Sequence, residues 1–352
     1  MLWAAVAVAV LVLAGTAVWV IRLGSAHQTT SQYVGSTATP RSRQSTEPAQ
    51  RHSSDPPRTS GRRYPAATLA PLYGTLFGAW VAPTGGATYS AEEASIRTFE
   101  SQIGRRLALD QLYVPWGNPF PMAVVHWDIG QGILPMISWA GTYTSQVAAG
   151  TYDAQFRAAA RELRALHRPV MLRWFPEMDG SQYRPLVASP ASFIAAWRHV
   201  HNIFTRAGAT NVIWAWCPNA LHFFDGVSQL YYPGSKYVDW VGADGYNWAP
   251  TLQRAPWRDF ASIFSAFYTW GRSSGKPMLV GEFGALERRP GDKAAWYRQT
   301  ETELRTRFPD IKALVYFNSD LAGFDWRINT SASSLAAFRA FANDPYFRAR
   351  PR

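Results

Sequence analysis

The fold is decided by residues 170–217, which read VMLRWFPEMDGSQYRPLVASPASFIAAWRHVHNIFTRAGATNVIWAWC. The two ends of this stretch, residues 170–175 and 211–217, are continuous runs of mostly apolar residues. Short continuous apolar runs are typical of strands that are buried on both faces, as in parallel sheets. We therefore expect two buried parallel strands at the ends of the stretch.

An amphipathic helix is predicted between these two strands, over residues 189–206. Phe193, Trp197, Val200 and Phe204 recur there at a spacing of three or four residues, which places them on one helix face. A Ser-Pro pair opens the segment, as expected at a helix start. The whole stretch is thus one strand–helix–strand unit.

The same alternation continues on both sides of this unit. Further apolar runs lie at 72–81, 108–116, 132–140, 237–244, 276–283 and 311–318. Further helical patterns lie at 151–167, 258–271, 294–308 and 334–347. Eight strands with intervening helices predict an α/β fold of the (β/α)8 TIM barrel type. A doubly wound open sheet is the alternative, but no glycine-rich phosphate loop follows the first strand.

The chain ahead of the barrel has a different composition. Residues 2–21 carry no charge, which predicts a transmembrane anchor or signal segment over 1–22. Residues 23–63 are rich in Ser, Thr, Pro and Arg and predict a disordered basic linker. The folded domain is then expected over 64–352, anchored at the cell surface, or secreted if the segment is cleaved. By the positive-inside rule, however, the arginines that follow the span favour a cytoplasmic location for the domain. The orientation of the span therefore stays open.

The charge and cysteine content exclude several classes of protein. The formal net charge is +11, but most of the excess lies in residues 22–63 and in the last five residues. The predicted barrel is nearly neutral for its size, so we expect no nucleic-acid partner. One cysteine excludes a disulfide scaffold, and the seven histidines lack metal-binding spacing. We expect no metal and no cofactor, and a monomer.

Two glutamates fall where a barrel carries its chemistry, at the carboxyl ends of strands. Glu177 follows the strand at 170–175, and Glu282 closes the strand at 276–283. A lone glutamate there is more simply a loop carboxylate or an ion-pair partner. A facing pair is the minimum for hydrolysing a glycosidic bond, because one carboxyl protonates the leaving oxygen while the other attacks the sugar.

Tryptophan is the second indication, with 16 among 352 residues. Indole rings stack on the apolar faces of sugars. We expect about half of the strand-end tryptophans to lie in the hydrophobic core. We also expect Trp197, Trp270 and Trp296, which fall in helical patterns, to lie there. The strand-end set is Trp80, Trp116, Trp139, Trp174, Trp216, Trp248 and Trp326.

Four blocks of sequence carry a resemblance to a known family. They are residues 173–180, 231–247, 276–284 and 316–327, in the order and at the spacing of a barrel. In these blocks the chain resembles glycoside hydrolase family 26. The resemblance implies a retaining β-glycanase on a (β/α)8 barrel, with members that act on β-mannan, mixed-linkage β-1,3-1,4-glucan or β-1,3-xylan.

The resemblance also implies roles for individual residues. Glu177 would be the general acid/base and Glu282 the nucleophile. Tyr246 would hydrogen-bond the nucleophile, Trp326 would form the floor of the site, and Arg173 would support the carboxylates from the barrel interior. The full set of expected substrate-binding residues is Tyr246, Trp326, Arg327, Arg173, Trp139, Asn219 and Trp248.

The chain departs from the family pattern next to the acid/base. Pro176 stands where family mannanases usually carry His, and Asp179 where they usually carry Asn. Proline can neither donate nor accept a hydrogen bond through its side chain, so mannan specificity is in doubt. We expect a retaining endo-β-glycosidase acting on β-mannan, β-1,3-1,4-glucan or β-1,3-glucan. The alternatives are a weakly active or inactive polysaccharide-binding barrel and a transglycosylase.

Overall fold

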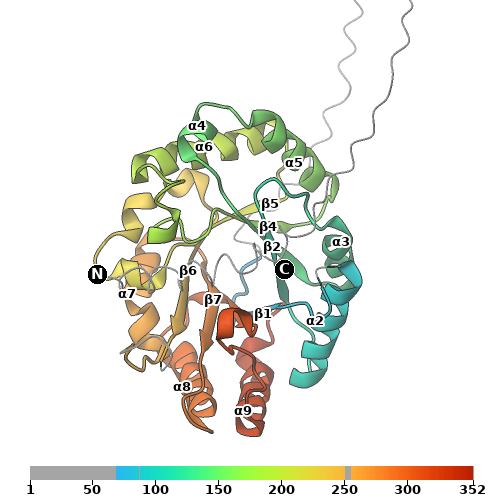
Figure 1. Cartoon of the computed structure of the whole chain (residues 1–352), viewed down its shortest axis with the longest axis vertical. Coiled ribbons are helices and arrows are strands. Elements are labelled where there is room, and N and C mark those ends of the chain that lie inside the picture. The colour runs from blue at the N-terminus through green and yellow to red at the C-terminus, as the bar shows by residue number, and fades with distance from the viewer. Residues whose placement is uncertain (1–68, 87, 250–254, 352) are drawn as a thin grey trace, which may run out of the picture.

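Eight parallel strands close into a barrel in the computed structural model, which describes residues 69–86, 88–249 and 255–351. The strands follow one another in chain order, and β1 pairs with β8 to close the sheet (Figure 1). The predicted (β/α)8 barrel is therefore confirmed. The strands are β1 Leu76–Val81, β2 Leu109–Val114, β3 Leu134–Trp139, β4 Val170–Trp174, β5 Val212–Trp216, β6 Trp240–Asn247, β7 Met278–Ala285 and β8 Ile311–Asn318.

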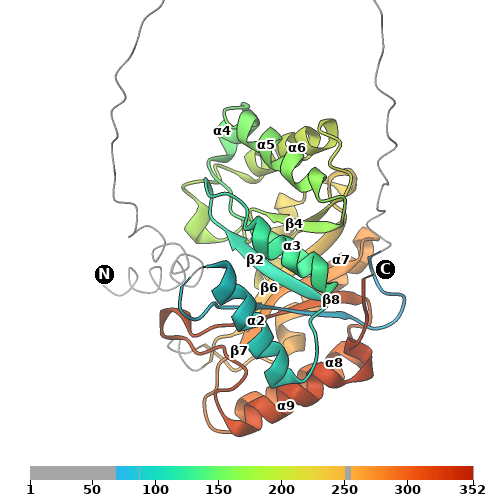
Figure 2. The same ribbon diagram turned by 90° about the vertical axis from the view of Figure 1, so that its right-hand side faces the viewer.

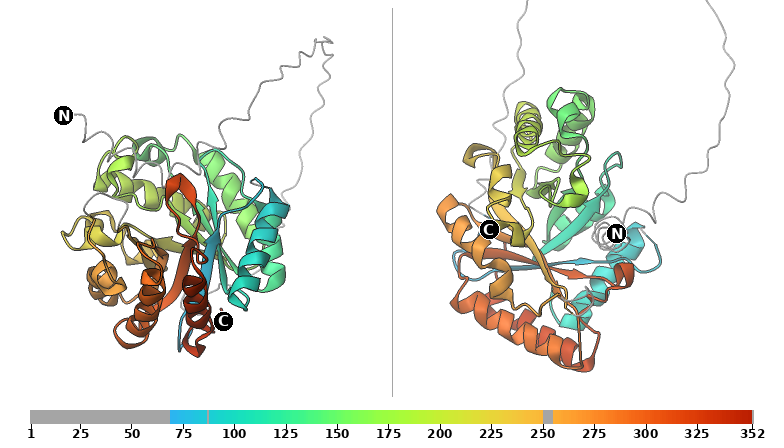
Figure 3. Two further views of the ribbon diagram at one scale, coloured as in Figure 1. Left: turned by 60° about the horizontal axis from the view of Figure 1, so that its bottom comes forward. Right: turned by 60° about the vertical axis from the view of Figure 1, so that its left-hand side comes forward.

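Helices cover the outside of the barrel (Figures 1 and 3). On one side α4, α5 and α6 pack together, and α8 packs against α9 on the opposite side (Figure 2). The helices are α2 Tyr89–Ile103, α3 Met122–Gln131, α4 Thr144–Ala148, α5 Asp153–Ala165, α6 Pro190–Arg206, α7 Phe260–Ser274, α8 Asp292–Thr306 and α9 Ala332–Asn343.

The helix ends correct and extend the sequence expectations. The helix predicted over 334–347 ends at Asn343, because the following Asp-Pro pair begins a separate 3-10 turn at Pro345. Helix α2 was not predicted; it is capped by Thr88, whose side chain accepts from the backbone of Ala91. Gly275 takes the left-handed conformation at the end of α7, as expected for a C-terminal cap.

The barrel interior is filled with apolar residues below the strand ends. Leu134 and Met136 are buried and alternate with Ser138 along β3, so the three share one face of the strand. Ser138 lines the cleft described below, which places the two apolar residues beneath it. On the outside, Trp197 and Trp296 are buried against the strands, as predicted for helical core residues. The cleft is thus confined to the end of the barrel where the strands have their carboxyl termini, and the interior beneath it is packed with apolar side chains.

No helix among the described residues is long and apolar enough to cross a membrane. The predicted anchor at 1–22 and linker at 23–63 lie outside the described residues.

Candidate active site

A cleft of about 350 Å³ opens at the carboxyl ends of the strands. Glu177 reaches it from the loop after β4, and Glu282 reaches it from β7 itself. The residues around it come from most of the barrel strands and the loops that follow them. They are Tyr113, Ser138, Ala140, Arg173, Pro176, Glu177, Gly180, Ser181, Gln182, Tyr183, Asn219, Leu221, His222, Asp244, Gly245, Tyr246, Trp248, Glu282, Phe317 and Trp326.

The carboxyl groups of Glu177 and Glu282 lie close together in this cleft. One carboxylate oxygen from each, together with one from Asp244, lies within 4.8 Å of the others. Retaining glycosidases hold their two carboxyl groups about 5–5.5 Å apart, whereas inverting enzymes hold them about 6.5–9.5 Å apart to admit a water. The upper bound of 4.8 Å between the two oxygens lies on the retaining side of this division.

Four donors converge on the carboxylate of Glu282. The Oη atoms of Tyr246 and Tyr113 donate to Oε2 and Oε1 over 2.5 Å each, and Gln111 Nε2 lies 3.4 Å from Oε1. Arg173 donates to the same Oε1. Burial, together with the negative charge of Glu282, raises the pKa of both tyrosines, so they remain donors. The side chain of Glu282 is therefore fixed in one orientation.

Arg173 connects the carboxylate of Glu282 to that of Asp244, which is more deeply buried. Its side chain is 1% exposed, and Nη1 donates to Asp244 Oδ1 over 3.0 Å. Cys217 Sγ lies 3.2 Å from the same oxygen. A Cβ atom on Gly281 would lie 2.6 Å from Cys217 Sγ and 2.7 Å from Asp244 Oδ1. Only glycine at 281 leaves room for this buried cluster.

Glu177 has an unusual backbone and a raised pKa. Its φ is +52°, in the left-handed region that non-glycine residues rarely adopt. Its N–H donates to the carbonyl of Cys217 over 2.9 Å, which supports that conformation. Burial, and then the negative charge of Glu282, raises the pKa of Glu177 to about 8. Glu177 is thus protonated at neutral pH, as a general acid must be.

A polar network lies behind Glu177 and is centred on Asp179. Its carboxylate accepts from Asn219 Nδ2 at 2.8 Å, Ser228 Oγ at 2.6 Å and His222 Nδ1 at 3.2 Å, and from the Asn219 backbone at 3.1 Å. A carboxylate only accepts, whereas an asparagine would also bring two hydrogens. The network therefore explains Asp179 at a position where the resembling family usually has Asn. The bond to Asp179 raises the pKa of His222.

Aromatic rings form the wall of the cleft beside Glu282. The ring centroid of Trp326 lies 4.8 Å from that of Tyr246 and 4.8 Å from that of Trp248. All three residues line the cleft. Such a wall suits the apolar face of a sugar ring.

The expected residues are only partly brought together. Five of the expected residues line the cleft with the two glutamates: Arg173, Asn219, Tyr246, Trp248 and Trp326. Their roles toward a substrate remain predictions.

The expectation for Trp139 is wrong. Ser138 points into the cleft, so the next side chain on β3 points out of the barrel. Trp139 is 2% exposed and packs against Trp116 and Phe156, with ring centroids 5.6 and 5.3 Å away. It is a core residue between the sheet and α5.

Arg327 lies outside the cleft lining, on the loop after β8. Its guanidinium pairs with Asp325 at 2.7 Å and with Asp320 at 3.0 Å, and its side chain is 45% exposed.

Trp174 and Trp216 are fully buried core residues. Among the strand-end tryptophans, Trp248 and Trp326 instead line the cleft.

The sequence reasoning missed several polar residues that hydrogen-bond the charged groups of the site, among them Gln111, Tyr113, Asp244 and His222. Gln111, Tyr113 and Asp244 lie inside runs that were interpreted only as buried strands. A polar residue inside a continuous apolar run is the signal that could have found them, because a buried polar group needs a partner. His222 follows β5 in a short 3-10 helix and carried no such signal.

The carboxylates of Glu177, Asp244 and Glu282 are close enough to share a cation. They form the one such group among the described residues. The guanidinium of Arg173 already contacts two of them. The donor set therefore fits an internal ion-pair cluster better than a metal site.

A closed (β/α)8 barrel with a carboxyl group of raised pKa after β4 and a carboxylate held on β7 has the arrangement of a retaining glycoside hydrolase. Residues 142–272 match the model of glycosyl hydrolase family 26. This match agrees with the resemblance to the same family that the sequence predicted.

One curated relative aligns with most of this chain, and another aligns with about two fifths of it. Endoglucanase H of Acetivibrio thermocellus is 32% identical over 280 residues, which cover 76% of this chain and 30% of that protein. A β-1,3-xylanase of a Vibrio species is 29% identical over 147 residues, or 39% of this chain and 28% of that protein. The chain spans less than a third of the length of either relative.

Solved structures share the fold. A β-mannanase from Bacteroides ovatus superposes with a TM-score of 0.61 at 15% identity, covering 83% of this chain and 94% of that chain. A modular endo-β-1,4-mannanase from Cellulomonas fimi gives a TM-score of 0.60 at 17% identity, covering 80% and 74%.

Proposed function

We propose that this protein hydrolyses a β-linked, neutral polysaccharide with retention of anomeric configuration. The observation that carries the proposal is the separation of the Glu177 and Glu282 carboxylate oxygens, which is no more than 4.8 Å. The family match and the names of the relatives support the same class of reaction.

The reaction proceeds in two displacements. First, Glu282 attacks the anomeric carbon and forms a glycosyl ester, while Glu177 gives its proton to the departing glycosidic oxygen and the C–O bond breaks. Then Glu177, now a carboxylate, takes a proton from water. The water oxygen attacks the anomeric carbon, and Glu282 leaves as a carboxylate. Tyr113, Tyr246 and Arg173 hold Glu282 in place for both steps.

The preferred substrate is a glucan of the β-1,3-1,4 or β-1,3 type. Pro176 offers no side-chain hydrogen bond where family mannanases usually carry His, which argues against recognition of the axial 2-hydroxyl of mannose. Two of the relatives are named an endoglucanase and a β-1,3-xylanase. Glucose and xylose both carry an equatorial 2-hydroxyl. β-Mannan is the second candidate, because the structural neighbours include mannanases.

The test is hydrolysis of a polymer panel by the purified full chain. The panel contains mixed-linkage β-glucan, β-1,3-glucan, β-mannan and β-1,3-xylan, and new reducing ends are measured. We expect release from a glucan and a loss of about 10⁴-fold or more in Glu177→Ala and in Glu282→Ala. Binding without hydrolysis would instead support a polysaccharide-binding barrel. Products longer than the starting oligosaccharide would support a transglycosylase.

Azide rescue separates the two carboxylates. With an activated aryl glycoside, azide should restore turnover of Glu282→Ala with inversion, because it attacks the sugar directly in place of the nucleophile. Azide should restore turnover of Glu177→Ala with retention, because it attacks the glycosyl ester in place of water. The opposite pair of stereochemical outcomes would reverse the assignment of the two residues.

We also propose that residues 1–22 hold the enzyme at the cell surface. The apolar stretch and the linker composition support this location. N-terminal sequencing of the mature protein and protease accessibility of the barrel in intact cells test it. A mature chain that begins after residue 22 would show secretion instead, and a protected barrel would show the opposite orientation.

A further inference from the structure

One lysine is buried behind the loop that follows β8, residues 319–331. Lys293 lies in the first turn of α8 and is fully buried. Lysine is almost never fully buried without a partner, and the helix dipole disfavours a cation in the first turn. The helix alone therefore does not account for a lysine at this position. The described lining of the catalytic cleft does not include Lys293, so a role in the reaction would have to pass through another residue.

The partners of Lys293 are two backbone carbonyls of that loop. Its Nζ donates to the carbonyl of Arg327 over 2.6 Å and to that of Asp325 over 3.3 Å. These two residues stand on either side of Trp326. The carboxylates of Asp325 and Asp320 form their ion pairs with the guanidinium of Arg327. The ammonium group of Lys293 thus serves the backbone and holds it on both sides of one residue.

The backbone of Trp326 itself is fixed by two more hydrogen bonds. Its N–H donates to the carbonyl of Ser319 over 2.7 Å, and its carbonyl accepts from Tyr316 Oη over 2.6 Å. Tyr316 Oη also lies 2.5 Å from the Oη of Tyr297 on α8. Helix α8 therefore supports three successive carbonyls of the loop, two through Lys293 directly and one through the two tyrosines.

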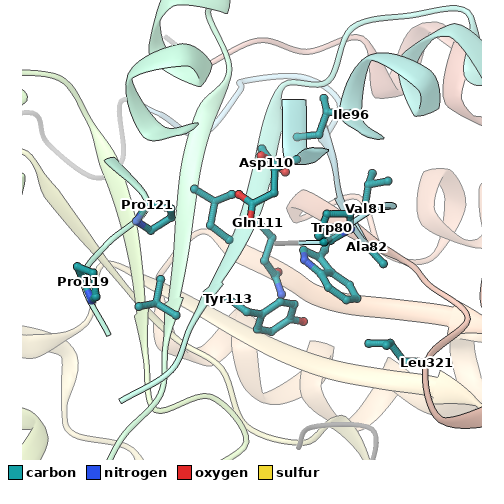
Figure 4. A pocket seen from close by; sticks show the side chains of 15 residues that line it. Trp80, Val81, Ala82, Ile96, Asp110, Gln111, Tyr113, Pro119, Pro121 and Leu321 are labelled. Carbon is teal, nitrogen blue, oxygen red and sulfur yellow. The ribbon is translucent and has the colours of Figure 1, made fainter. Parts of the chain in front are cut away.

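The loop meets open space on another side. Leu321 lies in a short 3-10 turn of the loop, Leu321–Gly323, and lines a cavity of about 320 Å³ together with Trp80 and Ala82 (Figure 4). Protein interiors are otherwise close-packed, so a loop that borders such a space lacks packing there. The position of the loop therefore relies on the hydrogen bonds from α8.

Lys293 can make these hydrogen bonds in either protonation state. Burial lowers the pKa of Lys293 to about 7, although the nearby carboxylates of Asp325 and Glu287 raise it. The positive charge of Arg327 adds to the lowering. An ammonium group carries three N–H donors and a neutral amine carries two. Both carbonyls therefore keep a donor on either side of that pH.

Trp326 transmits the position of the loop to the cleft. Its ring lies beside Tyr246, with the two ring centroids 4.8 Å apart, and Tyr246 donates to the carboxylate of Glu282. A shift of the loop would therefore change how the indole faces the space beside the nucleophile. Aromatic contacts depend on orientation as well as on distance, so such a shift would weaken stacking on a sugar ring.

We propose that Lys293 is a positioning residue of the active site, which clamps the two carbonyls that flank Trp326 and thereby fixes the indole against the sugar ring beside Glu282. The inference rests on the proposed function and specifies it further. It requires that loss of the clamp weaken sugar binding, and that this effect depend on the presence of Trp326.

The experiment measures KM and kcat of the full chain on the polymer that the parent protein hydrolyses. Lys293→Met keeps an unbranched side chain and removes the N–H donors. Arg298→Met, at an exposed position of the same helix, is the matched control. We expect Lys293→Met to raise KM about fivefold and to leave kcat within about twofold of the parent, because stacking serves the ground state and the transition state alike. The control should keep the KM of the parent.

A double-mutant cycle separates positioning from a general structural role. If Lys293 acts through Trp326, Lys293→Met should leave KM unchanged in a Trp326→Ala background. An equal rise of KM in both backgrounds, or no rise in Lys293→Met alone, would overturn the inference while the proposed function stood. A parent that hydrolyses none of the polymers would overturn the proposed function itself, and this inference with it.

A second variant covers a failure of Lys293→Met to fold, which thermal unfolding followed by circular dichroism would show. Lys293→Gln keeps two N–H donors on a stem that is one bond shorter, so it reaches the two carbonyls only in part. We expect a KM above that of the parent, and we expect this rise to vanish in the Trp326→Ala background. An unchanged KM, or a rise that persists without the indole, would contradict the role of Lys293.

Discussion

The guanidinium of Arg173 holds the carboxylate of Glu282 from inside the barrel. Arg173 comes from β4 and Glu282 from β7, so the contact crosses the barrel interior. The other end of the guanidinium pairs with Asp244 on β6, and all three side chains are at least nine-tenths buried. One cation thus ties three strands together directly beneath the reacting atoms.

Removing this cation should destabilise the fold strongly. Arg173→Leu leaves two buried carboxylates without their partner, which typically lowers the free energy of unfolding by about 3–5 kcal/mol. Urea denaturation at pH 7 measures the loss. The control is Arg157→Leu, because Arg157 pairs with Asp153 on the surface of α5 with a side chain that is 52% exposed, and such pairs contribute little. Equal losses in the two variants would show that the buried ion pairs do not stabilise the barrel.

The activity should fall on the alkaline side near pH 8. Glu177 must carry a proton to act as general acid, and burial with the neighbouring Glu282 raises its pKa to about 8. The kcat/KM should therefore decline as the pH rises through about 8. The positive charge of His222 lowers the pKa of Glu177, so His222→Gln should move this decline to higher pH. A decline centred near pH 5 would contradict the raised pKa of Glu177.

The raised pKa of Glu177 also implies that the stability of the fold depends on pH. An unfolded chain releases the Glu177 proton near pH 4.5, whereas the folded protein keeps it up to about pH 8. The folded state therefore loses stability as the pH rises through this window, and Glu177→Gln should remove that loss. We expect the Tm of Glu177→Gln to exceed that of the parent by about 2 °C or more at pH 9, and the difference to vanish near pH 4. A pH-independent difference would contradict this account.

The barrel and its two glutamates could be predicted from the sequence because both depend on local patterns. Continuous apolar runs define strands buried on both faces, and Glu177 and Glu282 each fall at the end of such a run. The side chain of Trp139 could not be placed in this way. Successive residues of a strand face opposite sides, so a difference of one position separates Ser138 in the cleft from Trp139 in the core.

The partners of Glu282 depend on closure of the barrel. Tyr113 lies 169 positions from Glu282 in the chain and Gln111 lies 171 away. Locally they are polar residues inside an apolar strand, and the sequence does not show which group they face. They become functional candidates only when β2 and β7 face each other across the closed sheet.

Tyr113 should be as important to the reaction as Tyr246, although the sequence pointed only to the latter. Each donates to a different oxygen of Glu282 over 2.5 Å. Loss of a hydrogen bond to a charged group costs about 1.5–3 kcal/mol, so Tyr113→Phe should lower kcat about 10–150-fold with a smaller change in KM. The matched control is Tyr268→Phe, whose hydroxyl bonds Asp310 on the outer surface of the barrel. If Tyr113→Phe retained the kcat of the control, the orientation of Glu282 would depend on its other three donors, Tyr246, Arg173 and Gln111.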